Sequence, residues 1–84
     1  MTDTTIVLYQ TDWCPYCQRV REALARLDLQ YRTVNVPDEH ANRTELGAIF
    51  GKTGVPSMTD AGVKIADDDD AIIAYLEKKY GKAS

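Results

Sequence analysis

Trp13-Cys14-Pro15-Tyr16-Cys17-Gln18 contains both cysteines of the chain, separated by two residues. It follows a short apolar run at residues 5–9, which is rich in β-branched side chains and is typical of a strand buried on both faces. It also begins a pattern in which apolar residues recur at helical spacing as far as Leu27. Pro15 suits the first turn of such a helix, because the N–H that proline lacks would have no partner there. The two thiols are therefore predicted to lie where a buried strand passes into a helix.

The rest of the chain supplies three more strands and two more helices. Asn42-Arg43-Thr44-Glu45 has the pattern of a capping box and would open the shorter helix, which Gly51 would close. The order β-α-β-α-β-β-α predicts an α/β fold: a parallel βαβ crossover, then a hairpin and a packing helix. We expect one four-stranded mixed sheet with helices on both faces. The further elements are strands at 31–36, after the turn at 53–58, and at 63–65, and helices at 42–50 and 69–80.

Length and composition limit the class of protein. The 84 residues allow one domain, residues 1–84, and the net charge of −3 argues against a nucleic-acid partner. The first residues lack the basic segment of a signal peptide, and no run approaches the ~20 apolar residues of a membrane span. A cytoplasmic protein is expected, and two cysteines in that compartment are rarely a structural disulfide. The cysteines are therefore expected to carry chemistry.

Cys14 would lie just before the helix, where unpaired backbone N–H groups and the helix dipole favour negative charge. Cysteines in such positions ionise more readily than free cysteine. Cys17 falls within the first turn on the inward face, where it can act as the resolving thiol. The pattern predicts thiol–disulfide exchange, in which the Cys14 thiolate attacks a disulfide and forms a mixed disulfide.

Two simpler explanations of the cysteines compete with redox chemistry. Half of a zinc site would need two further ligands, for which the chain offers only His40 and scattered carboxylates. Inert buried cysteines are disfavoured by a C-x-x-C motif after a strand in a βαβ pattern. The four aspartates at residues 67–70 could form a metal loop, but carboxylates at a helix start more often interact with the dipole. We expect neither a metal site nor a tightly bound cofactor.

Cys14-Pro15-Tyr16-Cys17 resembles the active site of dithiol glutaredoxins. Thr53-Gly54-Val55-Pro56 is similar to the cis-proline loop of that family, and residues 67–70 fall where glutaredoxins carry a glycine-aspartate turn. The resemblance covers nearly the whole chain and implies a thioredoxin-like fold. It also implies an enzyme that reduces glutathione mixed disulfides and protein disulfides, with Cys14 as nucleophile, Cys17 as resolving thiol and glutathione as co-substrate.

The same resemblance implies a groove for the thiol co-substrate. Tyr16 would line this groove, and the backbone of Val55 would pair with the tripeptide like an added strand. Pro56 would be cis. Asp68 and Asp69 would meet the γ-glutamyl end, where a backbone N–H and a carboxylate can bind its carboxylate and ammonium.

Some positions depart from the glutaredoxin pattern. Thr11 stands where the family usually has a lysine or arginine, and Lys52 could supply the missing cation for the glycyl carboxylate. Gly54 replaces the usual threonine of the cis-proline loop, and Ala66-Asp67 replaces the usual glycine pair. Trp13 would be either a lid over the thiols or a packing residue at the strand end.

Other resemblances leave alternatives open. Val55-Pro56 followed by residues 68–76 is similar to the N-terminal domain of glutathione transferases, which have a second, all-helical domain that we do not expect here. Thr11-Asp12-Trp13-Cys14 resembles mycoredoxins, actinobacterial relatives that use mycothiol. An iron–sulfur carrier with Cys14 as ligand, which Pro15 disfavours, and an electron donor to ribonucleotide reductase are further possibilities. The expected partners are a small thiol and disulfide-bonded or S-thiolated proteins, and the expected state is a monomer.

Overall fold

β1 (Ile6–Gln10) is one of the two inner strands of the sheet, in a computed structural model that describes residues 5–81. On one side β1 pairs in parallel with β2 (Arg32–Asn35), and on the other it pairs antiparallel with β3 (Ser57–Asp60). β4 (Val63–Ile65) completes a hairpin with β3, which gives the order β2-β1-β3-β4. The predicted parallel crossover and the predicted hairpin are both confirmed.

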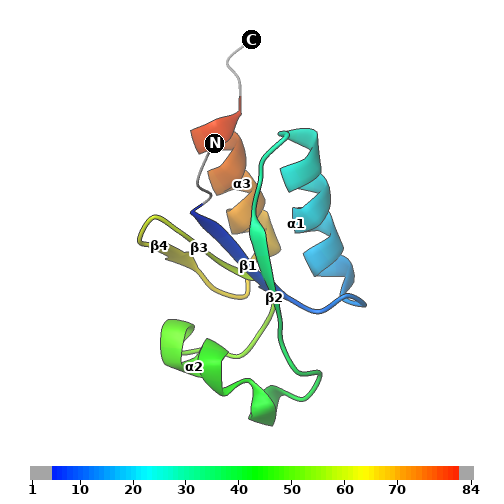
Figure 1. Cartoon of the computed structure of the whole chain (residues 1–84), viewed down its shortest axis with the longest axis vertical. Coiled ribbons are helices and arrows are strands. Elements are labelled where there is room, and N and C mark those ends of the chain that lie inside the picture. Colours follow the sequence, from blue (N-terminus) through cyan, green and yellow to red (C-terminus); the bar gives the residue numbers. More distant parts are fainter. Residues whose placement is uncertain (1–4, 82–84) are drawn as a thin grey trace.

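Two long helices cover one face of this sheet, as Figure 1 shows. α1 (Pro15–Arg26) and α3 (Asp69–Tyr80) lie side by side and share a core with alternate residues of the central strands. The alternation places Ile6 and Leu8 on the same face because side chains along a strand point to opposite sides in turn. The fully or nearly fully buried members of this core are Ile6, Leu8, Val20, Leu24, Met58, Ile72 and Leu76.

The opposite face carries the short helix α2 (Thr44–Phe50). Tyr9 of β1 packs edge-to-face against Phe50, with ring centroids 5.4 Å apart. Gly51 ends α2 in the left-handed conformation, φ 73°, as the sequence predicts. The sheet therefore has helices on both faces, which confirms the predicted α/β architecture.

The predicted capping box at Asn42–Glu45 is wrong. Residues His40–Asn42 form a separate 3-10 turn, η1, and α2 begins at Thr44 without a side-chain cap. The physical reason is Arg43, whose side chain is 3% exposed and turns back into the preceding loop. The chain must bend at Arg43 to bury it, so the helix starts after that residue.

Asp60 fixes the end of the sheet that lies away from the cysteines. Its buried carboxylate accepts hydrogen bonds from the Tyr75 hydroxyl at 2.8 Å, the Tyr80 hydroxyl at 2.6 Å and Lys79 Nζ at 3.2 Å, as well as from Thr5. Burial alone would raise the pKa of Asp60, but these four donors outweigh it and lower the pKa to about 2. The carboxylate thus anchors the last turns of α3 to β3.

Candidate active site

Cys14 is the residue immediately before α1, at the point where the chain leaves β1 and turns into the helix. Its backbone is extended (φ −79°, ψ 120°), and its carbonyl accepts the Gln18 N–H at 3.0 Å. The Cys14 side chain makes no capping hydrogen bond to the backbone. The residue is 7% exposed, and Pro15 occupies the first turn as predicted. The thiol therefore lies close to the free N–H groups of a helix N-terminus, where an anion is favoured.

Cys17 lies behind Cys14 and is fully buried, and both thiols are free. Burial raises the pKa of the Cys17 thiol to about 11, while a hydrogen bond from the Thr11 backbone lowers it. A hydrogen bond and the charge of Cys14 raise it further, and the charge of Arg21 acts in the opposite direction. Cys17 is thus held as a thiol in the reduced protein.

The cis-proline loop lies at the same end of the sheet as Cys14. The Val55–Pro56 peptide bond is cis, as predicted, with Val55 half-buried and Pro56 buried. β3 starts with Ser57, which pairs with Tyr9 near the carboxyl end of β1. Since Cys14 follows that end of β1, the sheet register brings the predicted loop and the predicted nucleophile to one edge.

Asp67 lies directly against this loop, and the sequence interpretation did not include it among the site residues. Its N–H donates to the Ser57 hydroxyl at 3.0 Å, and that hydroxyl donates to the Gly54 carbonyl at 2.9 Å. A methyl group at position 54 would overlap the Asp67 carboxylate, so any larger residue there requires the Asp67 side chain to move. The sequence contained a sign of this contact, because both positions depart from the glutaredoxin pattern. Gly54 is smaller than the usual threonine, and Asp67 is larger than the usual glycine.

The two aspartates that were predicted to bind the γ-glutamyl end have other partners in the structure. Asp68 caps α3, with Oδ1 accepting the Ala71 N–H at 3.0 Å. Asp69 pairs with Arg19 of α1, which also contacts Asp70 at 2.9 Å. These contacts join the N-terminal ends of α1 and α3, and of the two Asp68 carboxylate oxygens only Oδ1 accepts a hydrogen bond within residues 5–81.

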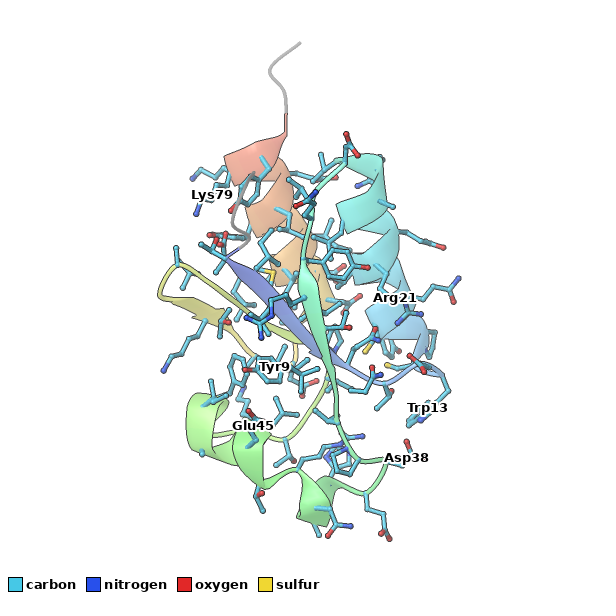
Figure 2. All side chains as sticks on the ribbon, in the orientation of Figure 1. Tyr9, Trp13, Arg21, Asp38, Glu45 and Lys79 are labelled. Atoms are coloured by element: carbon cyan, nitrogen blue, oxygen red, sulfur yellow. The ribbon has the colours of Figure 1, made fainter. Side chains whose placement is uncertain are left out.

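Two exposed aromatic residues flank Cys14. Trp13 is 65% exposed and Tyr16 is 58% exposed. The indole Nε1 of Trp13 donates to Asp38 Oδ1 at 2.8 Å, and Figure 2 shows these two side chains pointing toward each other. Trp13 is thus an exposed side chain that a hydrogen bond ties to Asp38.

Arg43 is a buried residue that the sequence interpretation assigned to a helix cap and not to the site. Its Nε donates to the Pro37 carbonyl at 2.6 Å and its Nη2 to the Asp38 carbonyl at 3.0 Å. Its Nη1 donates to the Thr53 carbonyl at 2.9 Å, just before the cis-proline loop. No sequence signal could have found it, because arginine is mostly exposed and these acceptors belong to the backbone.

Comparison with known proteins places this arrangement in a family. A model of the glutathione S-transferase N-terminal domain matches residues 8–84. A glutaredoxin of Pseudomonas aeruginosa is 31% identical over 77% of this chain and 77% of its own length. The chain belongs to the glutaredoxin-like family that is related to the N-terminal domain of glutathione S-transferases. An uncharacterised glutaredoxin-like protein of Clostridium pasteurianum is also 31% identical, over 88% of this chain and 99% of its own.

Solved glutathione transferases have the same fold as this glutaredoxin-like chain. A homologue from Drosophila mojavensis with bound glutathione has a TM-score of 0.86 and 33% identity over 95% of this chain. Glutathione transferase E6 of Drosophila melanogaster has a TM-score of 0.84 and 35% identity over 93%. The chain spans only 37% and 36% of the lengths of these two proteins, so their transferase activity belongs to larger molecules.

Thr11 and Lys52 are the two positions that bear on the missing cation of the glutaredoxin pattern. Thr11 is 3% exposed, and its hydroxyl has no hydrogen-bond partner among the described residues. Lys52, the predicted substitute cation, is exposed in the segment between Gly51 and the cis-proline loop. A buried hydroxyl and an exposed ammonium thus stand at the two positions that were considered for the missing charge.

Within residues 5–81, no group of three or more His, Cys, Asp or Glu side chains is arranged to hold a metal ion. In the same range no helix is long and apolar enough to cross a membrane.

Proposed function

We propose that this glutaredoxin-like protein is a dithiol oxidoreductase that reduces glutathione mixed disulfides and protein disulfides. The observation that carries the proposal is the position of Cys14, directly before α1 and at the same sheet edge as the cis-proline loop. A thiolate is the attacking species in disulfide exchange, and a helix N-terminus favours it.

In the proposed first step, the Cys14 thiolate attacks the glutathione sulfur of a protein mixed disulfide. The old S–S bond breaks, and a Cys14–glutathione disulfide forms. The protein substrate leaves as a thiolate and takes a proton from solvent. Burial of Cys17 supports this division of roles, because a fully buried thiol with a pKa near 11 is a poor first nucleophile.

Two routes then restore the enzyme. A second glutathione thiolate can attack the glutathione sulfur of the Cys14–glutathione disulfide, which forms oxidised glutathione and releases the Cys14 thiolate. Alternatively, Cys17 attacks Cys14 and releases glutathione, so that a Cys14–Cys17 disulfide forms and must later be reduced by two further thiols. The two cysteines are three residues apart at the start of α1, which brings their sulfurs within reach of each other.

Glutathione is the proposed co-substrate because the family match and the transferase homologue with bound glutathione both involve this thiol. The residues proposed to line its groove are Thr11, Trp13, Tyr16, Lys52, Gly54, Val55, Pro56, Asp67, Asp68 and Asp69. Val55 would pair its backbone with the peptide, and the second oxygen of Asp68 is available to the γ-glutamyl ammonium.

The proposal is tested by steady-state turnover of a glutathionylated peptide with Cys14→Ser and Cys17→Ser. The two variants make the same chemical change three residues apart, so each is the control for the other. Cys14→Ser should abolish turnover, and Cys17→Ser should retain it through the glutathione route. Full activity of the Cys14→Ser protein would overturn the proposed function.

A further inference from the structure

The loop between β2 and α2 is tied to two segments that border Cys14. On one side, the Asp38 carboxylate accepts the indole N–H of Trp13, the residue just before Cys14. On the other side, the Thr53 carbonyl belongs to the segment that enters the cis-proline loop. Arg43 donates to the backbone carbonyls of both Asp38 and Thr53.

The guanidinium of Arg43 fixes the positions of backbone carbonyls, and among the described residues it forms no ion pair. Its described hydrogen-bond partners are the carbonyls of Pro37, Asp38 and Thr53 and the ring of His40, none of which carries a negative charge. A planar fork of donors fixes the relative positions of its acceptors, which the single ammonium of lysine does not do. At 3% exposure this fork lies inside the loop, where it is shielded from water.

His40 adds a second link between the same two segments. Its Nε2 lies 3.2 Å from Arg43 Nη1, and because a guanidinium only donates, Nε2 must accept. The proton is then on Nδ1, which donates to the Thr53 hydroxyl at 3.0 Å. His40, through the Thr53 hydroxyl, and Arg43, through the Thr53 carbonyl, thus both hold Thr53 to residues 37–43.

We infer that Arg43 is a positioning residue, which holds the two walls of the thiol groove at a fixed separation. One wall is Trp13, reached through Asp38, and the other is the cis-proline loop, reached through Thr53. The inference rests on the proposed function for the use of the groove, and it assigns Arg43 a part in binding the small thiol of the mixed disulfide. Arg43 touches neither Cys14 nor the reacting sulfurs; it acts through the segments that it joins.

The first test is the fluorescence anisotropy of Trp13, the only tryptophan of the chain. Arg43→Lys keeps the charge but loses the fork, so the anisotropy should fall although Arg43 does not contact the indole. Asp38→Ala should lower it as well, and Asp38→Asn, which keeps an acceptor oxygen, should not. Arg26→Lys is the matched control, because Arg26 pairs with Glu77 elsewhere on the surface.

The second test is the kinetics of a glutathionylated peptide. Arg43→Lys and Asp38→Ala should raise KM about three- to tenfold, the range for one lost hydrogen bond, and should leave kcat within about twofold. Asp38→Asn and Arg26→Lys should behave like the wild type. A general loss of structure would instead lower kcat and the amount of folded protein.

Unchanged anisotropy and unchanged KM in Arg43→Lys would overturn the inference. If that variant does not fold, the Arg43 Nε–H signal of the wild type decides by NMR: protection from solvent exchange supports the inference, and rapid exchange overturns it. A wild-type protein that turns over no mixed disulfide would refute the proposed function instead. The anisotropy test needs no turnover, so the two failures are distinguishable.

Discussion

Replacing Cys14 with serine should lower the pKa of Cys17. In the reduced protein that pKa is about 11, against an ordinary value of 9.0, with burial as the largest cause. At pH 8 this leaves roughly one molecule in a thousand with a Cys17 thiolate, because each pKa unit is a factor of ten. The charge of Cys14 contributes to the increase and is removed in Cys14→Ser, whereas burial persists. The pKa in the variant should therefore lie between 9.0 and about 11.

The assay is a pH titration of the cysteine Cβ chemical shifts in protein labelled with ¹³C-cysteine. Cys17→Ser identifies the signals, because it removes the high-pH transition. A Cys17 pKa below 9.0 in the reduced wild type would refute the argument that burial dominates. An identical pKa in wild type and Cys14→Ser would refute the coupling between the two thiols.

The result matters for the catalytic cycle. When Cys14 is in a mixed disulfide it carries no charge, so part of the increase in the Cys17 pKa disappears at the step where Cys17 must attack. Closure of the Cys14–Cys17 disulfide should still quicken with pH, by about tenfold per unit until Cys17 is ionised. The glutathione route in Cys17→Ser should lack this dependence on Cys17.

Three further predictions concern stability. Asp60→Asn should lower the free energy of unfolding by about 1–3 kcal/mol in urea titrations. The reason is that the buried Asp60 carboxylate accepts hydrogen bonds from four donors, and the amide that replaces it is uncharged. In the wild type, the stability due to the ionised Asp60 should be complete above pH 3.8 and should be lost as pH falls through about 2, as acid titration followed by circular dichroism can show. Gly54→Ala should lower the melting temperature by overlap with Asp67, and Asp67→Gly in the same chain should restore it. The absence of an acid transition in that range, or of rescue in the double variant, would contradict the respective argument.

The junction of β1 and α1 could be predicted from the sequence because its determinants are local. An apolar β-branched run, a proline in the first turn and apolar residues at helical spacing each specify one element. Parallel pairing of β1 with β2 then follows from the length of the crossover. The cis peptide at Pro56 was predicted only through the resemblance to glutaredoxins.

The features that could not be predicted depend on contacts between distant segments. Arg43 donates to the backbone carbonyls of residues 37, 38 and 53. Every residue has a backbone carbonyl, so no pattern of side chains along the sequence identifies these acceptors. Asp67 could be placed against Gly54 only once the hairpin and the start of α3 were known in space. The aspartate run was correctly expected at a helix start, but its pairing with Arg19 joins two helices that are fifty residues apart.

The most direct test of the proposed chemistry is to trap the first intermediate and map it. Reduced Cys17→Ser protein is mixed with one equivalent of a glutathionylated peptide, quenched with acid and digested for mass spectrometry. The proposed mechanism predicts glutathione in disulfide linkage to Cys14, together with one equivalent of released peptide thiol. No adduct at Cys14, or a substrate peptide attached there in place of glutathione, would contradict it.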